Sequence, residues 1–240
     1  KLIMDNIQEQ PDNASNIVQW FDFVRNFEND LNKLHVDLDK MCHLVILAIE
    51  NCIVAFKSGD RELCRDILAG DKVINDMERS IESRAFSLIL RQQPIASDLR
   101  NVTSALKIVT DLERIGDQAA DIAEIIYHFE GKHAYRTVEH IPTMAKKAKI
   151  MVHEAIDAFI KKDLTTAQMV KNMDDEIDSL FEEVKQEVIE ILKENSEKVD
   201  YCIDFLMIAK YLERVGDHAV NICEWLEFNQ TGTVNQHRLI

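Results

Sequence analysis

The sequence predicts an all-α protein made of two tandem homologous three-helix bundles. An eight-residue block, Leu-Glu-Arg-Ile-Gly-Asp-Gln-Ala at residues 112–119, returns as Leu-Glu-Arg-Val-Gly-Asp-His-Ala at residues 212–219. Residues 41–57 also align with residues 144–160, at an offset of 103. Only six glycines and three prolines interrupt the 240 residues. An internal duplication with few turn-forming residues favours long helices in two similar units.

Apolar residues recur at helical spacing through most of the chain and predict three helices in each half. The first trio is expected at about residues 28–57, 60–92 and 98–129. The second trio is expected at about residues 143–161, 163–194 and 198–229. Ser58-Gly59-Asp60 and Pro94 separate the helices of the first half, and Asp163 and Ser196 are the expected N-caps in the second. No segment reads as a strand.

These helices divide the chain into five parts. They are an N-terminal extension (1–26), a first three-helix bundle (27–130), a linker (131–142), a second three-helix bundle (143–230) and a C-terminal tail (231–240). Residues 1–26 have no counterpart in the second half. We expect them to be either an extension that packs on the body or a partly disordered start.

The composition excludes several classes of protein. A net charge of −15 disfavours nucleic acid as a partner and favours cations, including metal ions. The five cysteines show no CxxC spacing, which suits a reducing cytosol better than a disulfide or zinc scaffold. Apolar runs such as residues 44–49 are much shorter than the roughly 20 residues of a membrane span. The start of the chain lacks the pattern of a signal peptide, so we expect a cytoplasmic protein.

Carboxylates gather on one face of the third helix of each half. Glu113 and Asp117 lie one helical turn apart, as do Glu213 and Asp217. The second helix of each half offers further oxygen ligands at the same spacing: Asp71 and Asn75, then Asp174 and Asp178. Two such stripes side by side would form an oxygen-rich groove in each bundle. Oxygen ligands favour iron, manganese or magnesium over zinc or copper, and converging carboxylates suit a multinuclear site.

A solvated helix face is the competing interpretation of the same carboxylates. Arg114 and Arg214 each precede an aspartate by three residues, so ordinary surface ion pairs would account for the charges. This alternative does not explain why both halves keep Glu, Arg, Gly and Asp at identical spacing. Gly116 and Gly216 border the core face, where close approach of a neighbouring helix is the favoured explanation.

The sequence shows no catalytic constellation. It contains no HExxH motif, and its one ExxH pattern, at residues 130–133, crosses Gly131 in the linker. Cys42 and Cys223 lie in apolar surroundings and are interpreted as core thiols rather than nucleophiles. We therefore expect a protein that is not an enzyme, with no catalytic residue and no organic cofactor.

Three motifs together resemble those of the PhoU family. They are the twin Leu-Glu-Arg-Xaa-Gly-Asp blocks, Gln-Pro-Ile-Ala-Ser-Asp-Leu-Arg at residues 93–100, and Asp-Lys-Val-Ile-Asn-Asp-Met-Glu at residues 71–78. The resemblance covers about residues 28–229 and implies two three-helix bundles in tandem, in agreement with the helical periodicity.

The resemblance also implies a function. It indicates a cytoplasmic negative regulator of phosphate-starvation signalling and phosphate uptake, which works through contacts. Its partners would be the ATPase subunit of a phosphate ABC transporter, a sensor histidine kinase and a second copy in a homodimer. It would meet a membrane only through protein partners, and no nucleic acid is implied.

Some members of the family bind multinuclear iron or other metal clusters through paired E(D)xxxD motifs. By resemblance, these motifs carry over to Glu113 and Asp117 with Asp71 and Asn75, and to Glu213 and Asp217 with Asp174 and Asp178. Asn75 departs from the pattern, because it stands where a carboxylate is expected. The first site would therefore carry one charge fewer and bind metal more weakly than the second.

The sequence is also compatible with two other functions. The acidic stripes alone would fit metal storage or a metalloenzyme, and PhoU-like domains also accompany other phosphate carriers. The sequence shows no Gly-rich phosphate loop and no basic anion pocket, so it does not indicate how phosphate status reaches the chain.

Overall fold

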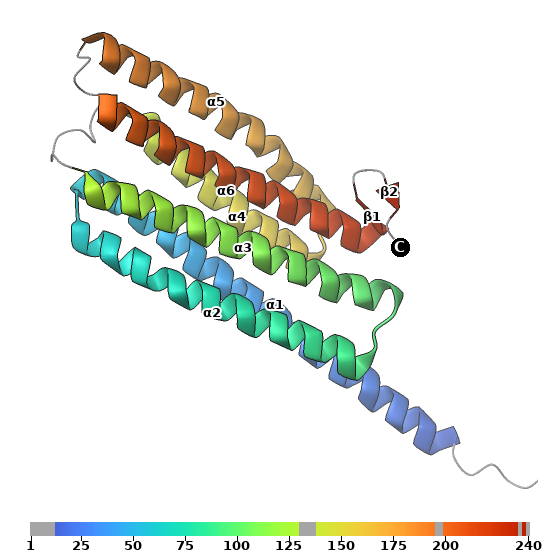
Figure 1. The fold of residues 1–240 in the computed structure, drawn as a ribbon. Coiled ribbons are helices and arrows are strands. Elements are labelled where there is room, and N and C mark those ends of the chain that lie inside the picture. Colours follow the sequence, from blue (N-terminus) through green and yellow to red (C-terminus); the bar gives the residue numbers. More distant parts are fainter. Residues whose placement is uncertain (1–12, 130–137, 195–198, 235–236, 239–240) are drawn as a thin grey trace, which may run out of the picture.

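The computed structural model describes residues 13–129, 138–194, 199–234 and 237–238. Its helices form two antiparallel three-helix bundles that lie side by side (Figure 1). The first bundle contains α1 (Asn13–Ser58), α2 (Arg61–Gln92) and α3 (Ala96–His128). The second contains α4 (His140–Lys161), α5 (Leu164–Glu194) and α6 (Val199–Thr231). The predicted tandem of three-helix bundles is confirmed.

The two bundles share one continuous core. Helix α1 packs on α4 and α3 packs on α6, while α2 and α5 lie on the outer sides (Figure 1). The apolar stripe predicted on the third helix is buried, since Leu112, Ile115, Ala119 and Ile122 are at most 1% exposed. Burial of such stripes is the main favourable term that holds helices of this kind together.

Helices α3 and α6 pack antiparallel, and hydrogen bonds between them fix their register. Ser104 Oγ donates to the backbone oxygen of Trp225 at 3.2 Å. Asn229 Nδ2 donates to Asn101 Oδ1 at 2.7 Å, and both side chains are buried. Buried amides that satisfy each other in this way specify one alignment of the two helices.

The helix ends follow the expected capping rules. Asp163 Oδ1 accepts hydrogen bonds from the backbone nitrogens of Thr165 and Thr166, which confirms Asp163 as the N-cap of α5. The other expected N-cap, Ser196, lies outside the described residues. Helix α2 ends at Gln92, and its C-cap residue Gln93 adopts the left-handed conformation (φ 44°) directly before Pro94.

Two helices begin earlier than the sequence predicted. Helix α1 begins at Asn13 rather than near residue 28, because residues 13–26 contain neither glycine nor proline to stop it. Helix α4 begins at His140, within the expected linker, and Pro142 fits its first turn because an N–H there has no helical partner. Glu187 supports this start by accepting a bond from the backbone nitrogen of Glu139 at 3.0 Å.

The expectation that no segment forms a strand was wrong at the C-terminal tail. Strands β1 (Thr233–Val234) and β2 (His237–Arg238) pair antiparallel after α6. Gly232 adopts φ 75°, and its backbone nitrogen donates to the oxygen of Phe228 at 2.7 Å. This left-handed glycine ends the helix and turns the chain into the hairpin.

One described stretch, Asn26–Ser58 of α1, is long and apolar enough to cross a membrane by length and composition alone. The core helix of a bundle passes the same test, and α1 packs against α2, α3 and α4. This single helix is therefore weak evidence for a membrane span.

At Gly116, α3 packs tightly against α2. A Cβ placed on Gly116 would lie 3.1 Å from Cγ2 and 3.2 Å from Cδ1 of Ile74, a β-branched side chain that is itself buried. Close helix approach thus explains the mid-helix glycine, as the sequence suggested. Gly70, by contrast, has no atom within 4 Å of its ideal Cβ position.

We expect Gly116→Ala and Gly70→Ala to shift the free energy of unfolding in opposite directions. Gly70→Ala gains helix propensity and should stabilise the protein by about 0.5–1 kcal/mol. Gly116→Ala gains the same propensity but overpacks a rigid neighbour, and should destabilise it by about 1 kcal/mol net. Urea unfolding of both variants measures the difference, and a stabilised Gly116→Ala protein would contradict the packing explanation.

Candidate functional site

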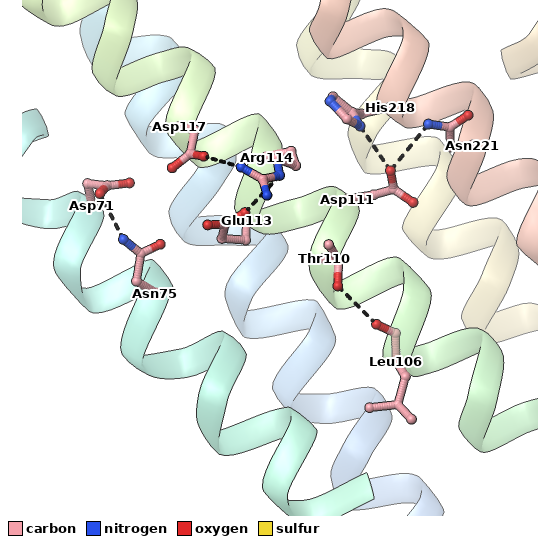
Figure 2. A network of polar contacts seen from close by, with 10 residues as sticks. All are labelled: Asp71, Asn75, Leu106, Thr110, Asp111, Glu113, Arg114, Asp117, His218 and Asn221. Atoms are coloured by element: carbon pink, nitrogen blue, oxygen red, sulfur yellow. Dashed lines mark hydrogen bonds and ion pairs between the residues drawn. The ribbon is translucent and has the colours of Figure 1, made fainter.

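The first acidic site consists of Asp71 and Asn75 on α2 with Glu113 and Asp117 on α3, and the structure brings all four together (Figure 2). Asn75 Nδ2 donates to Asp71 Oδ2 at 3.0 Å. Arg114 lies 3.1 Å from Asp117 Oδ2 and 3.5 Å from Glu113 Oε2. The predicted juxtaposition of the two stripes is therefore present in the first bundle.

Several oxygens of the first acidic site are buried and form no hydrogen bond with the described residues, although Arg114 forms an ion pair with one of them, Glu113 Oε2. They are Asp71 Oδ1, Asn75 Oδ1 and Glu113 Oε2. A buried acceptor without a hydrogen bond costs free energy. Carboxylate and amide oxygens of this kind are also the ligands that a hard cation binds. The site is thus chemically suited to a cation.

The second acidic site consists of Asp174 and Asp178 on α5 with Glu213 and Asp217 on α6, and these residues also lie together. Lys210 forms an ion pair with Glu213. Gly216 repeats the role of Gly116, because its ideal Cβ position lies 3.1 Å from Asp174 Oδ1. Here the close helix approach brings a carboxylate, rather than an apolar side chain, against the glycine.

Burial and like charges raise the pKa of carboxyls in both sites. Burial, and secondarily the charges of Asp217 and the neighbouring carboxylates, raises the pKa of Asp174 to about 6. Burial and then Asp117 raise the pKa of Asp71 and of Glu113 in the first site. The amide of Asn75 opposes this rise by donating to Asp71. Each site therefore holds more negative charge than its surroundings compensate.

The residues of each site are chemically suited to a divalent cation, but their side chains do not converge on a common point in the structure. Across the described ranges, no group of three or more Asp, Glu, His or Cys side chains stands in a metal-holding arrangement. Cation binding at either site therefore requires carboxylate side chains to turn toward a common point.

The surface ion pairs expected from the competing interpretation occur in one half. Arg114 pairs with Asp117, as the spacing suggested. Arg214 instead places its guanidinium 5.9 Å from the ring centroid of Tyr211 on its own helix. An ion pair between arginine and aspartate thus does not explain why the second half keeps the same four residue types.

The structure also shows a buried polar contact between the bundles that the sequence analysis missed. Asp111 on α3 is 9% exposed, and its Oδ1 lies 2.9 Å from His218 Nδ1 and accepts from Asn221 Nδ2 at 3.3 Å (Figure 2). These residues differ from their counterparts in the other half, so the repeat did not reveal them. The available signal was a charged residue within the apolar stripe between Ile108 and Leu112.

The cysteines are core thiols, as predicted. All five are buried, and none of them forms a disulfide. Burial raises the pKa of the Cys42 thiol to about 12 and that of the Cys223 thiol to about 12. Because the thiolate is the nucleophile, neither residue is suited to catalysis at neutral pH.

The fold and the two sites define a duplicated helical protein in which each bundle brings two carboxylate-bearing helices together. The chain belongs to the PhoU family: the PhoU domain model matches residues 38–126 and again residues 141–226. Both halves therefore carry the domain, which agrees with the internal repeat.

Curated relatives support this assignment over most of the chain. The chain is 39% identical over 207 residues to the phosphate-specific transport system accessory protein PhoU homolog of Clostridium acetobutylicum, covering 86% of this chain and 94% of that protein. It is 33% identical over 208 residues to the PhoU homolog 1 of Thermotoga maritima, covering 86% and 90%.

Solved structures share the fold. A crystal structure of PhoU from Pseudomonas aeruginosa is 30% identical with a TM-score of 0.79, over 86% of this chain and all of that one. The phosphate transport system regulatory protein PhoU of Streptococcus pneumoniae is 28% identical with a TM-score of 0.80, over 87% and 98%.

The raised pKa of Asp174 predicts a pH-dependent effect of Asp174→Asn in metal-free protein. The folded carboxyl has a pKa of about 6 against an ordinary 3.8, so its charge opposes folding above pH 6 and this penalty fades as the pH falls toward 3.8. Asp174→Asn should therefore stabilise the protein by about 1 kcal/mol at pH 7.5 and leave it unchanged near pH 4.

Denaturant unfolding with a chelator present, at pH 7.5 and pH 4, measures this effect. Asp66→Asn, at an exposed position of α2, is the control for a general change in net charge. Equal stabilisation by both variants would attribute the effect to net charge rather than to the second acidic site.

Proposed function

We propose that this chain is an accessory protein of a phosphate transport system that represses phosphate-starvation signalling and phosphate uptake. The observation that carries the proposal is the family match in both halves, together with curated relatives whose names state the accessory role. The internal repeat agrees with a family model that matches both halves of the chain.

The proposed mechanism is contact with partners rather than chemistry on a substrate. The chain would connect the ATPase subunit of a phosphate ABC transporter to a sensor histidine kinase in the cytoplasm. Outward-facing apolar side chains support a docking role, since Val73, Phe86 and Leu90 on α2 are each more than half exposed. Apolar groups on a solvent-facing helix are common features of protein interaction surfaces.

Both acidic sites are proposed to bind a divalent metal ion such as iron, manganese or magnesium, in one or several nuclei. Asp71, Asn75, Glu113 and Asp117 would hold it in the first bundle. Asp174, Asp178, Glu213 and Asp217 would hold it in the second. A bound cation would supply the positive charge that these groups lack. The residues themselves would link α2 to α3 and α5 to α6 across their points of closest approach.

Self-association as a homodimer completes the proposal, and it rests on the family resemblance. Sedimentation over a range of protein concentrations tests it separately from the signalling role. A single monomeric species at every concentration would remove the dimer and leave the adaptor proposal standing.

The regulatory role predicts a phenotype in phosphate-replete cells. Cells that lack the chain should show high activity of a starvation-inducible alkaline phosphatase, and the wild-type chain should restore low activity. Glu213→Gln with Asp217→Asn should fail to restore it if the second acidic site is required, because the metal ligands lose their charge. The measurement is phosphatase activity at equal protein abundance.

Glu190→Gln with Glu194→Gln is the matched control, because it neutralises an exposed pair at the same spacing on α5. This control should restore repression fully. Low phosphatase activity in the deletion would sink the signalling role and favour service to another phosphate carrier or metal storage.

Asn75→Asp should raise the affinity of the first acidic site for Mn²⁺ at least about tenfold, because it adds a charged ligand in a partly buried site. Without metal the same variant should be less stable, since it removes the hydrogen bond to Asp71 and adds a like charge. Titration of chelator-treated protein with Mn²⁺, followed by calorimetry, compares the two proteins. Unchanged affinity would argue against a metal at this site.

A further inference from the structure

A basic, serine-lined groove lies between α1 and α2, on a different side of α2 from the first acidic site. The groove has a volume of about 430 Å³. Its lining includes Lys33, Arg84 and Arg91 with the hydroxyls of Ser80, Ser83 and Ser87, and one carboxylate, Asp30. Such a concentration of positive charge is unusual in a chain with a net charge of −15.

The contacts within the groove leave donors for a ligand. Arg91 Nε donates to Ser87 Oγ at 2.9 Å, which fixes the guanidinium at the edge of the groove. Lys33 pairs with Asp30 at 2.9 Å. The pair between Arg84 and Asp37, at 3.1 Å, engages one nitrogen of a guanidinium that carries five N–H donors.

The second half shows that the fold does not require this groove to be basic. Helices α2 and α5 align at an offset of 103, and the buried positions keep their apolar character: Ile74, Ile81 and Leu88 match Ile177, Val184 and Ile191. The exposed stripe changes completely: Ser80, Arg84, Ser87 and Arg91 match Glu183, Glu187, Glu190 and Glu194. The basic groove thus belongs to the first bundle alone.

One contact in the stripe is structural in both halves, with its charges exchanged. Arg84 pairs with Asp37 of α1, and the equivalent Glu187 pairs with His140 of α4 at 2.8 Å. This contact ties the second helix of each bundle to the first. The counterparts of Ser87 and Arg91 in the second half are Glu190 and Glu194, which lie on the exposed face of α5. These two positions therefore do not tie the second helix to the first.

Gln92 also lines the groove. Its Oε1 is buried and has no hydrogen-bond partner among the described residues. The side-chain amide can turn so that its N–H₂ group, rather than its oxygen, faces an anion in the groove.

We propose that this groove binds a phosphate group, either as inorganic phosphate or as the phosphate of a small ester. Arginine forks and serine hydroxyls are the side-chain donors that suit tetrahedral phosphate oxygens. A net charge of −15 repels anions over most of the surface, so anion binding requires a local concentration of donors such as this groove provides. The inference goes beyond the proposed function and does not depend on it.

A hollow next to the groove allows the two sources of the phosphate group to be told apart, because an ester would also occupy this hollow. It shares Ser83, Ser87 and Arg91 with the groove, has a volume of about 600 Å³, and is bounded by Phe86 and Leu90. Phe86 is 54% exposed, so its ring is open to a planar partner. A nucleotide would place its phosphates on the shared edge and its base on Phe86.

Titration calorimetry of the purified full chain with inorganic phosphate and, separately, with ADP tests the proposal. We expect binding of at least one probe with a dissociation constant below about 1 mM. Arg91→Glu, which installs the residue of the second half, should weaken it at least about tenfold through loss of a charge-assisted bond. Ser83→Ala with Ser87→Ala should weaken it without any change in charge.

Arg65→Glu is the matched control, because it makes the same charge reversal near the other end of α2. It should leave the affinity unchanged, and helical circular dichroism verifies that every variant is folded. If both probes bind and Phe86→Ala changes neither affinity, the groove binds phosphate itself. If Phe86→Ala abolishes the binding of ADP alone, the groove binds a phosphate ester. The proposal is overturned if neither probe binds, or if Arg91→Glu and Arg65→Glu behave alike.

Discussion

The close packing of α2 against α3 at Gly116, and of α5 against α6 at Gly216, is the constraint on which both acidic sites depend. A side chain at either glycine would push the helices apart and separate the carboxylates that face each other across them. The same closeness removes water from these carboxylates, which raises the pKa of Asp71 and brings that of Asp174 to about 6. Helix packing and the raised pKa values of these carboxyls are therefore two results of one geometry.

The join between the bundles depends on a second constraint, the antiparallel register of α3 and α6. Asn101 with Asn229 fixes one end of it, and Asp111 with His218 fixes a point nearer the acidic sites. Because these partners are buried and polar, sliding the helices past each other would leave them unsatisfied. The two acidic sites are thus held in a fixed relation to each other.

The sequence predicted the fold and the pairing of the stripes well, because both follow from periodicity and repetition. Apolar spacing located the helices within a few residues, except for the start of α1, which lies at Asn13 rather than near residue 28. The twin blocks located Glu113 and Glu213 beside their aspartates. It did not predict the contact of Asp111 with His218, because that pair depends on how two distant helices cross. It also missed the basic groove, because Lys33 and Arg91 are brought together only by the packing of α1 on α2.

Duplication explains why the two halves agree in some positions and differ sharply in others. The buried positions of α2 and α5 are held by the need to fill the same core, so a change there costs stability. The groove-lining positions of α2 do not fill this core, and they diverge from serine and arginine to glutamate at the matching positions of α5. Asn75 against Asp178 is a smaller difference of the same kind. One bundle can therefore acquire a site for an anion while the fold and the paired acidic sites are retained in both.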